Sequence, residues 1–122
     1  MLKTILIVDD SKAMRALIQH TLKNAGYQVL EAGDGQEALL MLNNGLRPNL
    51  ILTDLNMPRM DGFEFTGAVR GNAEFNSVPI LFLTTEAAQE EKSRGKSLGA
   101  NGWLVKPFNP EKLIQVVGTM SV

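Results

Sequence analysis

Short runs of hydrophobic residues alternate along the chain with longer segments in which hydrophobic residues recur every three or four positions. The short runs have the length and the Ile, Leu and Val content of β-strands. They lie at residues 4–8, 28–32, 50–53, 80–84 and 102–105. Because the runs are continuously apolar, we expect strands that are buried on both faces, as in a parallel sheet covered by helices. The pattern predicts an α/β domain of five strand–helix units.

Capping residues mark the ends of the predicted helices. The first helix begins at Ser11, a favourable N-cap, and stops at Gly26. The third runs from about Gly62 to Arg70, and the last begins at Asn109 with a proline in its first turn. The apolar positions predicted to face the sheet include Met14, Leu17, Ile18, Thr21, Leu22 and Ala25 in the first helix and Leu113, Ile114 and Val117 in the last.

The fourth predicted helix, roughly Glu86 to Leu98, is much more polar than the others. Most of its residues are charged or amidated, and Gly95 in its interior costs about 1 kcal/mol relative to alanine. We interpret it as the least firmly held element, which suits a part that moves. On composition alone, a solvated surface helix is the simpler interpretation.

Bulk composition narrows the possible functions. A chain of 122 residues with 44% hydrophobic content fits one domain that buries roughly two-thirds of its unfolded surface. Lysine and arginine number 12 against 13 acidic residues, so direct binding of nucleic acid is not expected. The first apolar run is too short for a signal sequence or a membrane span, which predicts a cytoplasmic protein. The chain has no cysteine, so thiol chemistry is excluded.

Charged residues directly follow three of the predicted strands. Asp9 and Asp10 follow the first, Asp54 follows the third and Lys106 follows the fifth. Parallel strands bring their carboxyl ends to one edge of the sheet, where open α/β sheets place their active sites. We therefore expect three carboxylates and one ammonium group to share a pocket.

A cluster of carboxylates at this edge predicts a cation site. Adjacent carboxylates repel one another and raise at least one pKa unless a cation neutralises them. Mg²⁺ is the natural candidate because it takes oxygen ligands, and Mn²⁺ could substitute. Taken alone, the Asp9-Asp10 pair is more simply explained by helix capping. Its combination with Asp54 and Lys106 favours the metal site.

The same pocket can accept a phosphoryl group. Asp54 can act as a nucleophile and form an aspartyl phosphate when nearby cations offset the charge on the transferring group. Lys106 would bind one phosphoryl oxygen, and the hydroxyl of Thr84, which ends the fourth strand, could donate to another.

These residues, together with Asn56-Met57-Pro58 and Asp61-Gly62 after Asp54 and Pro107-Phe108 after Lys106, resemble the receiver domain of two-component response regulators. The resemblance spans essentially residues 1–122. It is strongest to the stand-alone chemotaxis type of receiver, which has no output domain. It implies a flavodoxin-like three-layer sandwich with strand order 2-1-3-4-5, a topology for which CheY is a standard example. It also implies a cis peptide between Lys106 and Pro107.

The resemblance assigns a role to each candidate residue. Asp54 would be the phosphoacceptor, Asp10 a direct Mg²⁺ ligand, Asp9 a ligand through water, and the backbone carbonyl of Asn56 a further ligand. Lys106 would bind the phosphoryl group.

A switch is implied as well, in which the Thr84 hydroxyl is coupled to an aromatic residue, here Trp103, where tyrosine or phenylalanine is more usual. The protein would be a switch with self-catalysed phosphorylation and dephosphorylation rather than a turnover enzyme. Its partners would be a histidine kinase, of chemotaxis type, and a downstream protein such as a flagellar switch component, bound through the surface of the fourth helix, fifth strand and fifth helix. We expect a monomer.

Two other functions use related features. A haloacid-dehalogenase-like phosphatase also forms an aspartyl phosphate with Mg²⁺, but it requires an Asp-x-Asp motif after an early strand, and here Asp9 and Asp10 are adjacent. A flavodoxin-like electron carrier needs a loop rich in hydroxyl groups and glycine at the place that these two aspartates occupy.

Overall fold

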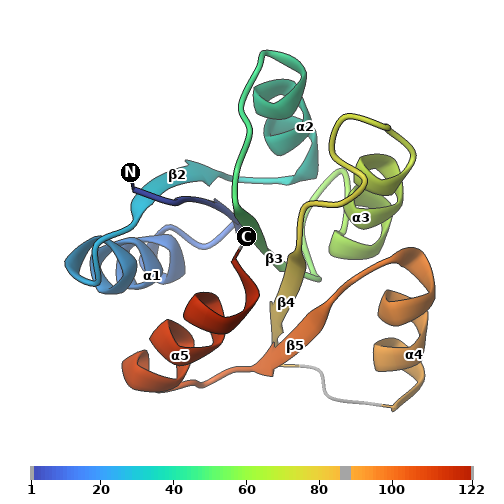
Figure 1. Ribbon diagram of the computed structural model, residues 1–122. Coiled ribbons are helices and arrows are strands. Elements are labelled where there is room, and N and C mark those ends of the chain that lie inside the picture. The colour runs from blue at the N-terminus through green and yellow to red at the C-terminus, as the bar shows by residue number, and fades with distance from the viewer. Residues whose placement is uncertain (1, 86–88, 122) are drawn as a thin grey trace.

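The computed structural model describes residues 2–85 and 89–121, and it contains one five-stranded parallel sheet (Figure 1). The strands pair in the order β2-β1-β3-β4-β5, and every neighbouring pair is parallel. The bounds are β1 Thr4–Val8, β2 Gln28–Ala32, β3 Leu50–Asp54, β4 Ile80–Thr84 and β5 Gly102–Val105. Both the predicted fold class and the strand order are confirmed.

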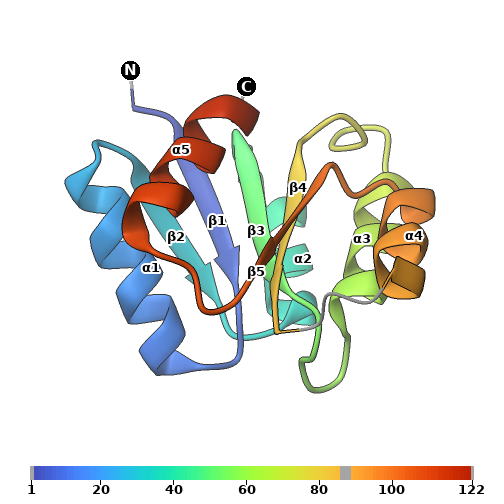
Figure 2. The ribbon, with the colours of Figure 1, turned by 90° about the horizontal axis from the view of Figure 1, so that it is seen from below.

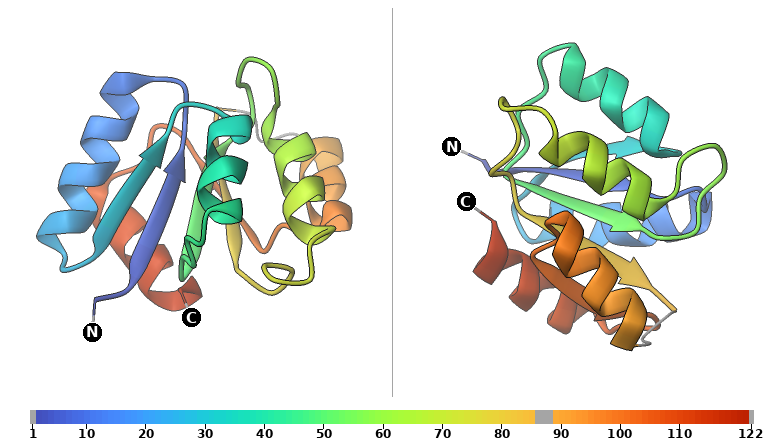
Figure 3. Two further views of the ribbon diagram at one scale, coloured as in Figure 1. Left: turned by 90° about the horizontal axis from the view of Figure 1, so that it is seen from above. Right: turned by 90° about the vertical axis from the view of Figure 1, so that its right-hand side faces the viewer.

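In the described part of the chain, five helices cover the sheet. They lie on its two faces, which makes three layers (Figures 2 and 3). Helices α1 and α5 lie on one face, and α2, α3 and α4 lie on the other. Their bounds are α1 Lys12–Asn24, α2 Gly35–Asn43, α3 Gly62–Arg70, α4 Gln89–Leu98 and α5 Pro110–Met120. Residue Glu86, the expected start of the fourth helix, lies outside the described residues. Within the part of the chain that is described, no helix has the length and apolar character needed to cross a membrane.

The inner strands β1, β3 and β4 are almost entirely apolar because each contributes to two cores, whereas the edge strand β2 carries exposed Gln28 and Glu31. In β1, Leu6 and Val8 pack into the core under α2 and α3, whereas Ile5 and Ile7 pack into the core under α1 and α5. Successive side chains of a strand point to opposite faces, so a strand buried on both sides has no polar positions. In the inner strands, the same geometry leaves only the strand ends free to carry charged groups, such as Asp54 at the end of β3.

Three positions predicted to be buried are exposed. Leu17 of α1 is 47% exposed and Ile114 of α5 is 36% exposed. Ala25, which follows α1 as its C-cap, is also exposed. Each helix buries a narrower stripe than its apolar pattern suggested, such as Ile18, Thr21 and Leu22 in α1. Leu17 precedes Ile18 by one residue and is rotated by about 100° from it around the helix, which places it beyond the edge of this stripe.

Candidate functional site

The strand register brings the predicted site residues together at the carboxyl edge of the sheet. Val8 pairs with Thr53, so Asp9, which follows β1, lies beside Asp54, the last residue of β3. Asp54 pairs with Leu83, which precedes Thr84 at the end of β4. Thr84 pairs with Val105, which precedes Lys106. The predicted convergence is confirmed.

Three carboxylates form a compact cluster at this edge. One oxygen from each of Asp9, Asp10 and Asp54 lies within 4.8 Å of the others. Asp9 is buried, Asp54 is partly buried and Asp10 is exposed, so the cluster opens to solvent on one side. This all-oxygen donor set suits a hard divalent cation such as Mg²⁺, which keeps several water ligands.

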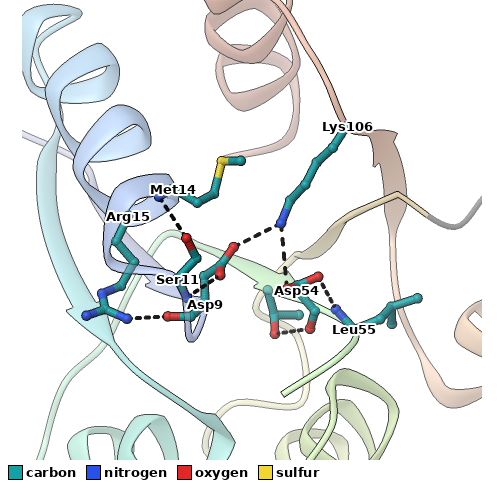
Figure 4. Close-up of polar contacts among 8 residues, drawn as sticks. Asp9, Ser11, Met14, Arg15, Asp54, Leu55 and Lys106 are labelled. Atoms are coloured by element: carbon teal, nitrogen blue, oxygen red, sulfur yellow. Dashed lines mark hydrogen bonds and ion pairs between the residues drawn. The ribbon is translucent and has the colours of Figure 1, made fainter. Parts of the chain in front are cut away.

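Lys106 lies between the two less exposed carboxylates (Figure 4). Its Nζ is 3.0 Å from Oδ2 of Asp9 and 3.6 Å from Oδ2 of Asp54. The Lys106–Pro107 peptide is cis, as the resemblance implied. The Lys106 ammonium thus pairs with two of the three carboxylates, and the cluster keeps an excess of negative charge.

Burial raises the pKa of Asp54 above its usual value. The Lys106 ammonium opposes this rise, the Asp9 carboxylate adds to it, the hydrogen bond from the Leu55 amide lowers the pKa, and Asp10 raises it again. The Leu55 amide donates to Oδ1 of Asp54 at 2.8 Å. Because the negative charge is incompletely balanced, a bound divalent cation would favour the ionised, nucleophilic form of Asp54. The residues present thus fit the metal that the sequence predicts.

Backbone contacts hold Asp9 in place. The Ser11 amide donates to Oδ1 of Asp9 at 2.9 Å, while the Ser11 hydroxyl caps α1 by accepting from the Met14 amide. Arg15 donates to the Asp9 carbonyl (Figure 4). It also pairs with Glu31 of β2 at 3.3 Å. Sequence reasoning missed Arg15, because one arginine on an amphipathic helix gives no signal that distinguishes it from a solvated residue.

The remaining predicted residues lie in the loop after β3 and on β4 and β5. Asn56 is exposed in the loop that follows β3, two residues beyond Asp54. Thr84 is fully buried at the end of β4. Trp103 lies on β5 opposite Phe82, and the two rings meet edge to face with centroids 5.3 Å apart. Trp103 also lines a cavity of about 280 Å³ with Lys92, Lys96 and Ala100, between α4 and β5.

Gly95 of α4 packs against this aromatic pair. A Cβ atom at Gly95 would lie 2.6 Å from Cε2 of Phe82 and 3.3 Å from Cζ3 of Trp103. The glycine that the sequence suggested as a weak point of the helix is therefore a point of close approach. Only the three-dimensional packing shows this, since nothing in the local sequence pairs residue 95 with residues 82 and 103.

Comparisons with known proteins give a consistent picture. The family model described as "Response regulator receiver domain" matches residues 5–118. The chemotaxis protein CheY1 of Helicobacter pylori is 41% identical over 120 residues, which cover 94% of this chain and 97% of that protein. The structure of the chemotaxis protein CheY4 of Vibrio cholerae superposes with a TM-score of 0.94 at 48% identity, over 98% of this chain and 99% of that one.

Part of a larger protein is also similar. The sensor histidine kinase CheAY of Helicobacter pylori is 39% identical over 114 residues, which cover 93% of this chain but 14% of that protein.

Proposed function

The chain belongs to the response regulator receiver family and is of the CheY-like type, and from this premise we propose that Asp54 accepts a phosphoryl group from a histidine kinase. The observation that carries the proposal is the position of the Asp54 carboxylate, next to Lys106 and within a cluster of two further carboxylates. The transfer forms an O–P bond at Asp54 and breaks the N–P bond of a phosphohistidine. Asp54 needs no general base, because its ionised carboxylate is itself the nucleophile.

Each neighbouring group has a separate task in this proposal. Asp9, Asp10, Asp54 and the Asn56 carbonyl would hold Mg²⁺, with Mn²⁺ as a substitute. When bound, the metal would offset negative charge on the carboxylates and on the transferring group. Lys106 supplies a second positive charge at the phosphoryl oxygens, and Thr84 supplies a hydroxyl donor.

The product of the reaction is a changed surface rather than a released compound. Phosphorylation adds about two negative charges and three acceptor oxygens at Asp54. Movement of Thr84 and Lys106 toward them would reposition Trp103 and alter the surface formed by α4, β5 and α5. The phosphoryl group would thereby shift an equilibrium between two arrangements of that surface.

The relatives suggest the biological setting. Since the near full-length relatives carry the name chemotaxis protein, we place this chain in a chemotaxis pathway, phosphorylated in the cytoplasm by a chemotaxis-type kinase. As a monomer it would then bind a downstream protein such as a flagellar switch component. The similarity to part of a sensor histidine kinase supports a partner of that class.

A labelling experiment tests the central step. The protein is mixed with Mg²⁺ and acetyl phosphate, and its intact mass is measured alongside the variants Asp54→Asn and Asp61→Asn. We expect a gain of one phosphoryl group in the unsubstituted protein and in Asp61→Asn, but not in Asp54→Asn. Asp61 is a matched control because it lies in the same loop and caps α3, a task that asparagine also performs. Labelling of Asp54→Asn, or none of the unsubstituted protein, would refute the proposal.

The conformational step has its own measurement. Trp103 is the only tryptophan in the sequence, so its fluorescence reports directly on the proposed switch. Adding a beryllofluoride mimic with Mg²⁺ should change the emission of the unsubstituted protein and leave that of Asp54→Asn unchanged. An emission and an amide exchange pattern in α4 that do not respond to the mimic would rule out the proposed movement.

The two alternative functions are not favoured by the comparisons and have simple signatures of their own. A phosphatase would hydrolyse an added phosphoester over many turnovers, whereas a receiver is modified at Asp54 and then loses the phosphoryl group. A flavin carrier would purify as a yellow protein.

A further inference from the structure

The loop that joins Asp54 to α3 contains a strained turn at Pro58-Arg59-Met60. The Met60 amide donates to the Pro58 carbonyl at 2.7 Å, and Arg59 between them has a φ of 66°. A hydrogen bond between residues two apart around a positive φ defines the rarer, strained form of γ-turn. Among the residues that the structure describes, Arg59 is the one non-glycine residue with positive φ. Such a conformation persists only where its surroundings enforce it.

Two contacts with the amino end of α2 hold the turn in this conformation. The Arg59 guanidinium forms an ion pair with the carboxylate of Asp34, whose side chain is 3% exposed. Asp34 is itself fixed, because its Oδ1 caps α2 by accepting from the Glu37 amide at 2.9 Å. The neighbouring Met60 packs on Gly35, where an added Cβ would lie 3.0 Å from Sδ of Met60.

Both ends of the loop are also fixed. At its start, the Leu55 amide binds the Asp54 side chain. At its end, the Gly62 amide donates to the Leu55 carbonyl at 2.8 Å, and a Cβ at Gly62 would lie 2.4 Å from the Asp54 carbonyl oxygen. Asn56 lies between these fixed points and the turn. The backbone dihedrals of Arg59 therefore help to determine the direction in which the Asn56 carbonyl points.

We propose that Arg59 is a positioning residue, whose ion pair with the buried Asp34 holds this loop in the shape that presents the Asn56 carbonyl to the acidic cluster. The affinity of the site for Mg²⁺ then depends on a contact with α2, a helix that contributes no ligand. The inference rests on the proposed function, because it takes the cluster to be a Mg²⁺ site. The competing explanation is an ordinary surface ion pair, which contributes little.

Replacement of Arg59 by glycine separates these explanations by the sign of the effect. The change removes a positive charge from the loop that follows Asp54, so electrostatics alone would tighten Mg²⁺ binding. It also relieves the strained φ, because glycine adopts positive φ freely. If the ion pair positions the loop, Arg59→Gly instead weakens Mg²⁺ binding while the protein keeps its thermal stability.

The experiment measures Mg²⁺ binding by titration calorimetry. Arg59→Gly should raise the dissociation constant about tenfold, the lower end of the range for groups that orient metal ligands. Arg59→Asn, which also tolerates positive φ but lacks the charge, should behave alike, and Arg59→Lys should recover most of the affinity. Amide exchange of residues 55–61 without Mg²⁺ should be faster in Arg59→Gly, a change that requires no phosphorylation to observe.

A double-mutant cycle with Asp34→Asn completes the test. Asparagine keeps the helix cap and removes the ion pair, so the double variant should bind Mg²⁺ no more weakly than Arg59→Gly alone. Glu74→Gln is the matched control, since it breaks the exposed Arg47–Glu74 ion pair and should leave the affinity unchanged.

Equal or tighter Mg²⁺ binding by Arg59→Gly, or additive losses in the cycle, would overturn the inference and leave the proposed function intact. Failure of the unsubstituted protein to bind Mg²⁺ would overturn both.

Discussion

Replacing Gly95 by alanine should destabilise this protein, although alanine is the better helix former. Gly95 lies inside α4, where the substitution would ordinarily add about 1 kcal/mol of stability. The new Cβ would lie 2.6 Å from Cε2 and 3.2 Å from Cδ2 of Phe82. Both distances are below normal van der Waals contact, so the helix or the ring has to move.

The ring has little freedom to move. Phe82 is fully buried, and its ring packs edge to face against Phe63 at 5.6 Å and against Trp103 at 5.3 Å. Overpacking of such a core costs typically about 1–3 kcal/mol. With the gain in helix propensity of about 1 kcal/mol subtracted, the net loss should be between about 0 and 2 kcal/mol. For a domain of this size, a loss of about 1 kcal/mol lowers the melting temperature by about 4 °C, and a loss of about 2 kcal/mol lowers it by about 8 °C.

Gly67 of α3 provides a matched control with the opposite sign. It also lies inside a helix, but a Cβ there would meet no atom within 4 Å. Gly67→Ala should therefore stabilise the protein by about 1 kcal/mol through helix propensity alone. Thermal unfolding followed by circular dichroism compares the two variants directly.

A third variant isolates the cause of the loss. In a Phe82→Leu background, the aromatic atoms nearest to the new Cβ are absent, so Gly95→Ala should become neutral or stabilising. If Gly95→Ala raises the melting temperature as much as Gly67→Ala does, the conclusion that α4 packs closely on Phe82 is wrong. If the loss persists in the Phe82→Leu background, its cause lies elsewhere.

Three further predictions concern charged groups. Burial raises the pKa of Asp54, so the contribution of this carboxyl group to stability is full below its unfolded pKa of 3.8 and is lost as pH rises through its folded pKa. In the presence of a chelator, Asp54→Asn should therefore raise the melting temperature at pH 7. This gain should vanish as the pH is lowered toward about 4. The hydrogen bond from the Glu37 amide lowers the pKa of Asp34, so the contribution of Asp34 to stability is present above its unfolded pKa of 3.8 and is lost as pH falls through its folded pKa. Asp34→Ala should lower the free energy of unfolding, measured with denaturant, by about 1 kcal/mol at pH 7 and by less in acid. Lys106→Met should slow labelling by acetyl phosphate about a hundredfold without loss of helical signal, and an unchanged rate would remove Lys106 from the reaction.

The site was predictable because it depends on topology more than on side-chain detail. Asp9, Asp54 and Lys106 each follow an apolar run, and parallel pairing alone places the ends of such runs at one edge. Any sequence that fixes the strands therefore fixes the convergence of these residues. The strand register adds only the distances between these side chains, such as the 3.6 Å between Nζ of Lys106 and Oδ2 of Asp54.

The supporting contacts were not predictable for the opposite reason. In the sequence, Arg15 and Arg59 look like ordinary solvated residues. Only the fold brings Arg15 to the Asp9 carbonyl and Arg59 to the Asp34 carboxylate. Exposed Leu17 shows the same limit from the apolar side, because helical periodicity gives the direction of a buried stripe but not its width.

Two features that the sequence left separate, a glycine in the most polar helix and a tryptophan on the last strand, form one packing arrangement. The indole of Trp103 lies against Phe82, and α4 approaches both rings where Gly95 lacks a side chain. Interiors packed at this density do not deform continuously, so a rotation of the indole has to alter the support of α4. Arg94 of the same helix adds a further contact, because its guanidinium lies 4.2 Å from the centroid of the Phe63 ring. In the proposed switch, a movement of Thr84 and Trp103 would reach α4 through this contact. The missing Cβ at residue 95 leaves room for both rings, because a Cβ there would lie 2.6 Å from Cε2 of Phe82 and 3.3 Å from Cζ3 of Trp103.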